Sequence, residues 1–252
     1  IRSEKNIEED NYAAALEWME ARGVRITSSS LGYTTFDSGE SSYTYNDMNG
    51  RTTIVTRAAE MAFERGVIVL TAAGNDGNNS WHYISAPGDG INTITVGALT
   101  PGGQVASYSS RGPSSDGRIK PEICTQGSNV VHSLPLMETY GMGNGTSYAT
   151  PLAAGITALL LEAYPHLTNV QVRNILLQSG DNIAAPNNDR GYGLLSAVKA
   201  LNQPNIEKAG PAYKIRKMFI GVENAYQVFG DGAALDAANS VLSGESAPME
   251  IK

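Results

Sequence analysis

The chain has 252 residues, of which 41% are hydrophobic and 27 are glycine, and its formal net charge is -7. This length and composition suit one glycine-rich α/β enzyme core followed by a tail. The acidic balance and the lack of a Lys or Arg cluster argue against nucleic acid or a membrane surface as partners, and no apolar run reaches the roughly 20 residues of a membrane span.

The first predicted helix and strand lie near the N-terminus. Apolar residues recur at helical spacing between Asn11 and Arg22, and Gly23 follows as the stop. The β-branched segment Val24–Ser29 then predicts a strand, which ends in Ser30-Leu31-Gly32. An amphipathic helix that leads directly into a strand is typical of an α/β fold.

A polar insertion, Tyr33–Gly50, follows this strand, and we expect a surface loop near a ligand cleft. Its oxygen-bearing side chains make it a candidate calcium site. The spacing misses the EF-hand pattern, so these side chains are alternatively only solvated. The candidate calcium ligands are Asp37, Glu40, Asp47 and Asn49.

The second predicted helix spans Arg51–Arg65 and leads through Gly66 into a strand over Val67–Ala72. Its predicted buried face consists of Ile54, Ala58, Met61 and Ala62. A further buried strand is predicted over Thr93–Ala98. The lone Cys124, flanked by apolar residues, is interpreted as a small buried side chain and excludes an internal disulfide.

The glycine-rich turn Gly143–Gly145 precedes Thr146, Ser147 and the long apolar run Leu152–Leu161. This pattern places Ser147 on the first turn of a buried helix. Free backbone N–H groups and the positive end of the helix dipole face a group that the hydroxyl attacks, so a developing oxyanion is stabilised there. Ser147 is therefore a candidate nucleophile, although a hydroxyl in this position more often serves only as an N-cap.

The C-terminal part predicts one more amphipathic helix, Val170–Leu177, and then a tail. Pro204, Gly210 and Pro211 indicate a linker after residue 202. Strands are predicted within Tyr213–Phe229 and a short helix over Ala233–Leu242, with no recognisable chemistry.

Two segments make the chain resemble the subtilisin-like serine proteases, or subtilases. The run from Gly145-Thr146-Ser147 to Gly155 is similar to the family's nucleophile motif, and Gly66–Gly77 is similar to the strand and turn that present its oxyanion-hole asparagine, here Asn75. The resemblance covers residues 1–202 and implies a partial peptidase domain of three-layer α/β fold with a mostly parallel sheet. It also implies a secreted or extracytoplasmic enzyme, and it leaves residues 203–252 as a C-terminal extension.

The same resemblance implies a peptide-binding cleft. Ser30, Leu31 and Gly32 correspond to the family's substrate-binding edge, which pairs with an extended peptide and forms one wall of the primary specificity pocket. The second wall corresponds to Ala72, Ala73 and Gly74, with Asp76 at the rim. A rim carboxylate predicts a bias toward Lys or Arg before the cleaved bond, unless Asp76 only caps the adjoining turn.

The chain departs from the family in one respect that concerns catalysis. A subtilase triad needs Asp, His and Ser in that order, yet no suitable Asp and His motifs precede Asn75. Asp37-Ser38-Gly39 has no apolar strand ahead of it, and the three histidines, His82, His132 and His166, all come too late. We expect a chain that lacks the N-terminal strands and corresponds to the C-terminal two-thirds of a catalytic domain.

These observations together predict a serine endopeptidase that acts on peptide or protein substrates, with no metal or cofactor apart from the calcium candidate. This chain alone is predicted to be inactive, the catalytic Asp and His being on a separate N-terminal fragment, and to expose an open sheet edge and apolar surface. Two alternatives stay open. One is a non-catalytic peptide-binding remnant, and the other is an α/β-hydrolase whose only later histidine is His166.

Overall fold

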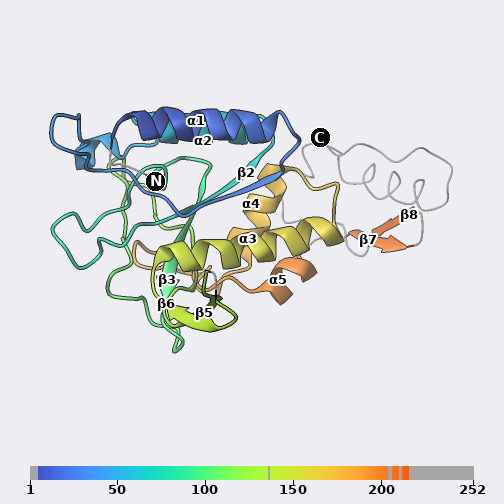
Figure 1. The fold of residues 1–252 in the computed structure, drawn as a ribbon. Coiled ribbons are helices and arrows are strands. Elements are labelled where there is room, and N and C mark those ends of the chain that lie inside the picture. The colour runs from blue at the N-terminus through green and yellow to red at the C-terminus, as the bar shows by residue number, and fades with distance from the viewer. Residues whose placement is uncertain (1–4, 136, 204–205, 210–211, 216–252) are drawn as a thin grey trace.

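The computed structural model describes residues 5–135, 137–203, 206–209 and 212–215. Two helices cover one face of a β-sheet and two others, one of them the longest of the described helices, pack on the other face, which gives three layers (Figure 1). In chain order the elements are α1 (Ile7–Glu20), β1 (Ile26–Ser29), the 3-10 helix η1 (Tyr45–Asp47), α2 (Ile54–Glu64), β2 (Ile68–Ala72), β3 (Ile94–Leu99), β4 (Ile123–Gln126), β5 (Val130–Ser133), β6 (Tyr140–Gly143), α3 (Thr146–Ala163), α4 (Asn169–Gln178), α5 (Ala197–Asn202), β7 (Ile206–Ala209) and β8 (Ala212–Ile215).

The main sheet has four strands in the order β1-β2-β3-β4, and every neighbouring pair is parallel. This confirms the predicted α/β class with a parallel sheet, and the three predicted strands lie within two residues of β1, β2 and β3. Among the described strands β1 pairs only with β2, so it forms one edge. The carboxyl ends of β1 and β2 lie side by side, and these ends carry the predicted cleft residues.

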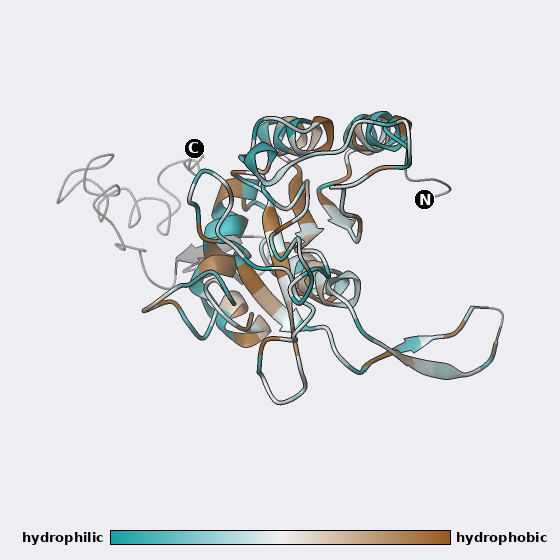
Figure 2. Ribbon diagram, turned by 90° about the vertical axis from the view of Figure 1, so that its left-hand side faces the viewer, coloured by the Kyte–Doolittle hydropathy of each residue, from teal (hydrophilic) through white to brown (hydrophobic). Residues whose placement is uncertain are grey.

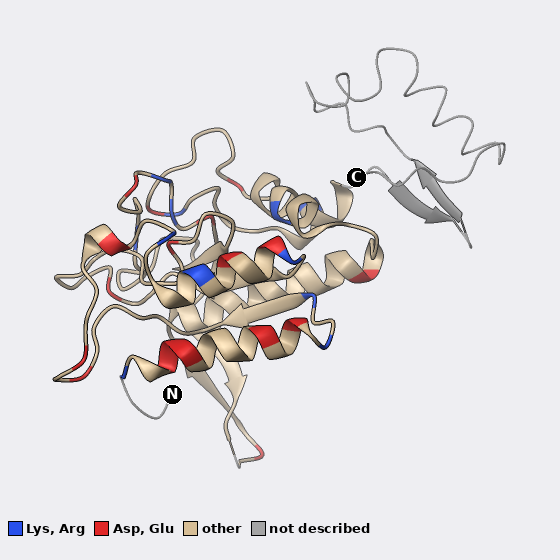
Figure 3. Ribbon diagram, turned by 90° about the horizontal axis from the view of Figure 1, so that it is seen from above, with Lys and Arg blue, Asp and Glu red and all other residues tan. Residues whose placement is uncertain are grey.

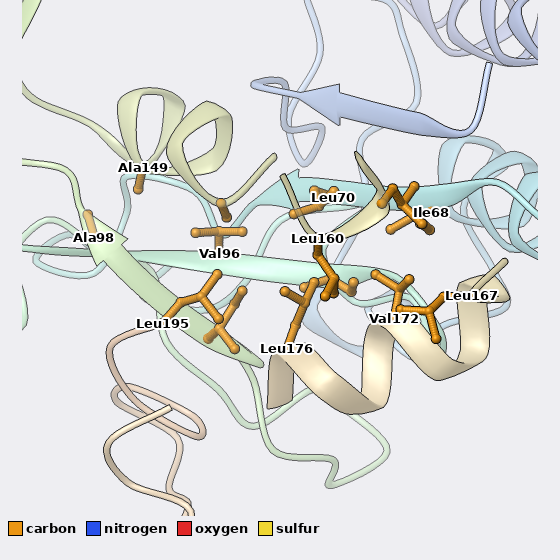
Figure 4. Packing of buried hydrophobic residues seen from close by; sticks show 14 of the residues in the cluster. Ile68, Leu70, Val96, Ala98, Ala149, Leu160, Leu167, Val172, Leu176 and Leu195 are labelled. Atoms are coloured by element: carbon orange, nitrogen blue, oxygen red, sulfur yellow. The ribbon is translucent and has the colours of Figure 1, made fainter. Parts of the chain in front are cut away.

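The larger core lies between the sheet and the α3–α4 layer (Figure 4). Leu70 of β2 and Val96 of β3 point toward Leu160 of α3 and Leu176 of α4, and all four are fully buried. The helix α3 contacts all four strands of the sheet. Burying these side chains fixes the axis of α3, and therefore the position of its first turn at the carboxyl ends of the strands.

The opposite face of the sheet is covered by α1 and α2, and here one prediction is wrong. Ile54 and Met61, both predicted to be buried, are 39% and 55% exposed. Ala62 is buried as predicted, and it shares the buried face with Val55 and Ala59. The helix is rotated by about one residue from the predicted orientation, or roughly 100°. Its buried Thr56 explains the rotation, because the Thr56 hydroxyl donates to the buried carboxylate of Asp89.

The hairpin of β5 and β6, which the sequence did not predict, projects from the body of the molecule (Figures 2 and 3). It immediately precedes Gly145 and α3.

Strand β4, also not predicted, pairs with β3. After α5, β7 and β8 form an antiparallel pair, and the other predicted strand residues and the helix over Ala233–Leu242 lie outside the described residues.

A buried ionic cluster joins the amino-terminal ends of β3 and β4 to α4. Lys120 is fully buried, and its ammonium group donates to Glu122 Oε1 at 2.7 Å and Thr95 Oγ1 at 3.1 Å. Arg173 approaches the same carboxylate oxygen at 3.4 Å. Burial lowers the pKa of Lys120, because the protein interior disfavours its charged form. Each of these charges is therefore tolerated only while its partner is present.

We expect Lys120→Met to lower the free energy of unfolding by about 3–5 kcal/mol, because it leaves the Glu122 carboxylate buried beside a weaker partner. Urea unfolding measures this change. The double variant Lys120→Met/Glu122→Leu should recover most of the loss, whereas Arg57→Met on the exposed surface of α2 should change little. A double variant as unstable as the single one would contradict this account.

Candidate active site

The site is built around the turn that leads into α3. Gly145, the residue before the helix, has φ of 148°, a conformation that side-chain-bearing residues rarely adopt. Its N–H donates to the Gly127 carbonyl at 2.8 Å and to the Tyr108 hydroxyl at 3.1 Å. These bonds hold the turn against the end of β4. Ser147 then follows as the second residue of the helix, as the sequence predicted.

The side chain of Asn75 is oriented by the first residue of α3. Its carboxamide oxygen accepts from the Thr146 N–H at 2.9 Å and from the Thr146 hydroxyl at 3.1 Å. With the oxygen engaged by two donors, the NH₂ group of Asn75 points away from Thr146. Asn75 and Ser147 both line one cleft. An amide donor and a hydroxyl are thus presented together beside the start of a helix.

Ser30 connects the edge strand to the nucleophile candidate. Pro151 lies inside α3 and has no N–H, so the carbonyl four residues earlier, that of Ser147, receives no helical hydrogen bond. The Ser30 hydroxyl donates to this carbonyl at 2.9 Å instead, and the Ser147 hydroxyl donates to the Ser30 carbonyl at 3.5 Å. The end of β1 and the first turn of α3 are therefore held together at the serine.

A cleft of about 290 Å³ lies at the carboxyl ends of the paired strands β1 and β2, and most predicted site residues line it. Ala73 is the exception: it is fully buried, because side chains alternate along an extended segment and its neighbours Ala72 and Gly74 face the cleft. The lining residues are Ser30, Leu31, Gly32, Thr34, Ala72, Gly74, Asn75, Asp76, Ser85, Thr146 and Ser147.

Two of these lining residues extend the sequence interpretation. Ser85, which the sequence did not single out, is buried at the cleft, and its hydroxyl has no hydrogen-bond partner in the described structure. It is packed where a side chain at Gly32 or Gly74 would collide with it, which explains two glycines in the walls. Asp76 lines the cleft, and its carboxylate also accepts a hydrogen bond from Asn79 Nδ2 at 2.6 Å in the adjoining turn. Its position is therefore compatible with both predicted roles, at the rim of the pocket and in the turn.

The remaining titratable candidates lie elsewhere. His82 Nδ1 is 2.9 Å from the Gly77 carbonyl, and the His132 ring packs on Tyr148 with centroids 5.1 Å apart. Among the described residues, no histidine ring forms a hydrogen bond with the Ser147 hydroxyl. That hydroxyl donates only to the Ser30 carbonyl. Cys124 is buried as predicted, and burial raises its pKa to about 12, which makes it a poor nucleophile.

Two of the four candidate calcium ligands, Asp47 and Glu40, accept hydrogen bonds from backbone N–H groups. Asp47 accepts from the Thr44 N–H at 2.8 Å as part of a capping box, while Glu40 accepts from the Asn6 N–H at 3.2 Å. Within the described part of the chain, no group of three or more acidic, His or Cys side chains is arranged to hold a metal. Nor does that part include a helix long and apolar enough to cross a membrane.

Comparison with known proteins gives consistent matches. The sequence model of the subtilase family matches residues 1–194. Serine protease AprX of Bacillus subtilis (strain 168) is 37% identical over 147 residues, or 50% of this chain and 33% of that protein. Subtilisin BL of Lederbergia lenta is 35% identical over 190 residues, or 75% of this chain and 61% of that protein. The chain thus spans between a third and three-fifths of these two relatives.

Solved structures agree with the sequence matches. The prenylagaramide maturation protease PagA superposes with a TM-score of 0.61 at 25% identity, covering 77% of this chain and 67% of that one. Sphericase superposes with a TM-score of 0.59 at 28% identity, covering 74% and 63% of the two chains.

Proposed function

The chain belongs to the subtilase family, and we propose that it is the nucleophile-bearing part of a serine endopeptidase. The observation that carries the proposal is the pair of Thr146 bonds that turns the Asn75 amide group outward at the cleft that also holds Ser147. Ser147 Oγ attacks the substrate carbonyl carbon, and the oxygen that gains charge accepts from Asn75 Nδ2 and the Ser147 N–H. The C–N bond then breaks, and water later releases the acyl group from Ser147.

The Ser147 proton needs a base, which we propose comes from a segment that carries Asp and His and is not in this sequence. The outer face of α3 supports this partner: Leu152 and Leu159 are 44% and 50% exposed, and Gly155 between them is open. The free edge of β1 lies beside the same helix. A strand added to β1 and an apolar face laid on α3 would cover both surfaces. By family resemblance, the enzyme acts outside the cytoplasm.

The geometry argues against the α/β-hydrolase alternative. Its base must follow the serine in sequence, and His166 is the only such histidine. The 18-residue helix α3 separates the two residues and is about 27 Å long, so the His166 ring is far beyond hydrogen-bond reach of Ser147. His166 instead packs edge-on against Tyr164.

Labelling of Ser147 with a fluorophosphonate tests the proposal. We compare this chain alone with native material that contains the rest of its protein, and intact masses identify any second polypeptide. Native material should be labelled about 10²- to 10⁴-fold faster, because only there does a base take the serine proton. Ser147→Ala should abolish labelling. Native material that binds peptides at the cleft yet is never labelled would support the non-catalytic alternative.

A matched pair of variants tests the proposed partner surface. Leu159→Glu on α3 should slow labelling of native material by about tenfold or more, because it places an unpaired charge in the contact. Met61→Glu adds the same charge to an exposed apolar position on α2, on the opposite side of the sheet, and should leave the rate unchanged. Equal effects would refute the α3 surface as the partner site.

Asn75→Ala should lower kcat of the complete enzyme by roughly one to two orders of magnitude with little change in KM. The lost hydrogen bond strengthens as charge develops, and a bond to a charged group is worth about 1.5–3 kcal/mol. Asn78→Ala, at an exposed position that does not line the cleft, is the control. A rise in KM with kcat intact would show that Asn75 only binds substrate.

The cleft also supports a preference for the residue before the cleaved bond. The small residues of the cleft walls leave room for a long substrate side chain. Inside the cleft, the Ser85 hydroxyl has no hydrogen-bond partner and offers a polar contact, and Asp76 adds a carboxylate at the rim. We propose a bias toward Lys and Arg. The Asp76 contribution is about 0–1 kcal/mol because solvent and salt screen it.

Peptide profiling of the complete enzyme and its Asp76→Asn variant measures this bias. The ratio of cleavage after basic residues to cleavage after apolar residues should fall in the variant by up to about fivefold at low salt, and less at high salt. An unchanged ratio at low salt would leave Asp76 with its Asn79 contact and the turn as its only role.

A further inference from the structure

A second cavity lies along α2, the helix that covers the face of the sheet opposite to α3. Its volume is about 430 Å³, and it shares no lining residue with the cleft that holds Ser147. Arg51 and Arg57, near the start of α2, line this cavity together with Ile91 and Asn92 from the segment before β3. The cavity is therefore separate from the catalytic features described above.

The two arginines of this cavity are unpaired. Within the described part of the chain, neither guanidinium group of Arg51 and Arg57 forms a hydrogen bond or an ion pair. Carboxylates are not scarce in this chain, whose formal net charge is -7. Four other arginines are each paired with a carboxylate, and these are Arg111, Arg118, Arg173 and Arg190. The absence of a partner for Arg51 and Arg57 thus distinguishes this place on the surface.

The acidic residue best placed to neutralise Arg57 bonds to other groups. Glu60 follows Arg57 by three residues, a spacing at which helical side chains can pair. Its carboxylate instead accepts from the Asn92 N–H and Asn92 Nδ2, both at 2.8 Å, and from the Thr93 N–H at 3.2 Å. Glu64 also lines the cavity, about 10 Å further along the helix than Arg57, and it pairs with no described residue.

The helix dipole adds positive potential near the arginines. The first turn of α2 contains no acidic residue, and the positive end of a helix disfavours a cation such as Arg57 and favours an anion. The backbone N–H groups there are already used: that of Thr56 donates to the Thr53 hydroxyl at 3.2 Å, and that of Val55 donates to the buried carboxyl of Glu9. Burial raises the pKa of Glu9, which disfavours its negative charge. A bound anion would therefore contact the arginine side chains.

The segment 89–92, which contributes to the cavity wall, is fixed by hydrogen bonds. Arg118 donates to the carbonyls of Asp89 and Gly90 at 2.7 and 2.9 Å. Arg173 donates to the next two carbonyls, at 3.3 and 3.1 Å. Four consecutive carbonyl groups are thus satisfied within the protein. A wall that is already ordered loses little conformational freedom when a ligand binds.

We propose that this cavity binds a small oxyanion, either phosphate or the carboxylate of an organic acid, between Arg51 and Arg57. A guanidinium group presents a fork of N–H donors that matches the oxygens of both groups. Met61 and Ile91 also line the cavity and give apolar contact to the carbon chain of an organic acid. This binding site is independent of the proposed peptidase function, because it involves no residue of the cleft.

Calorimetric titration of the native protein with phosphate or succinate, at constant low ionic strength, tests the site. The wild type should bind at least one of the two anions at concentrations up to about 50 mM. Binding of phosphate alone identifies a tetrahedral ligand and binding of succinate alone a carboxylate, and either result supports the site. Arg51→Met and Arg57→Met should each weaken binding by about five- to twentyfold.

Two further variants distinguish this site from general attraction of anions to the surface. Arg65→Met removes an exposed arginine that follows α2 and does not line the cavity, so binding should be unchanged. Glu64→Gln removes a negative charge from the cavity and should tighten binding by about two- to threefold. Urea unfolding without added anion reports whether each variant is folded.

Three results would overturn the proposal. The first is that the wild type binds neither phosphate nor succinate. The second is that Arg65→Met weakens binding as much as Arg51→Met and Arg57→Met do. The third is that Glu64→Gln weakens binding while the variant stays folded.

Discussion

The hydrogen bonds between Thr146 and Asn75 are the contacts on which the geometry of the site depends. They join the loop after β2 to the first turn of α3, across 71 residues of sequence. Tyr108 also holds this turn, because its hydroxyl accepts from the Gly145 N–H and donates to the Gly127 carbonyl at 2.7 Å. Asn75 and Gly127 lie just beyond β2 and β4, two strands of one parallel sheet. A small displacement of the helix would therefore change the direction of the Asn75 amide as well as the position of Ser147.

Much of this arrangement could be predicted because its signals are local. A glycine turn followed by a long apolar run determines where α3 starts, and β-branched segments predicted β1, β2 and β3, the first two of them directly after a predicted helix. The family motifs then related Asn75 to Ser147 although they lie far apart in sequence. The edge residue Ser30 was also predicted at the site, but the sequence did not reveal its bonds to Ser147.

The parts that were not predicted depend on contacts between distant segments. The rotation of α2 follows from the buried bond between Thr56 and Asp89, which a helical periodicity cannot reveal. The Ser85 hydroxyl reaches the cleft from a loop whose path is set by its packing against Gly32 and Gly74. A lysine is normally expected at the surface, yet Lys120 is buried. Its burial is explained by its hydrogen bonds to Glu122 and Thr95, which become visible only in the folded structure.

The proline inside α3 links two positions that the sequence alone gives no reason to compare. Because Pro151 cannot donate to the Ser147 carbonyl, that acceptor is available to the Ser30 hydroxyl on another element. Substitutions at position 30 and position 151 should therefore be coupled in related proteins: proline at 151 is compatible with a hydroxyl donor at 30, while a residue with an N–H at 151 removes the need for it. Such covariation would result from one hydrogen bond, which the Ser147 carbonyl accepts either from within its own helix or from the residue that follows the edge strand.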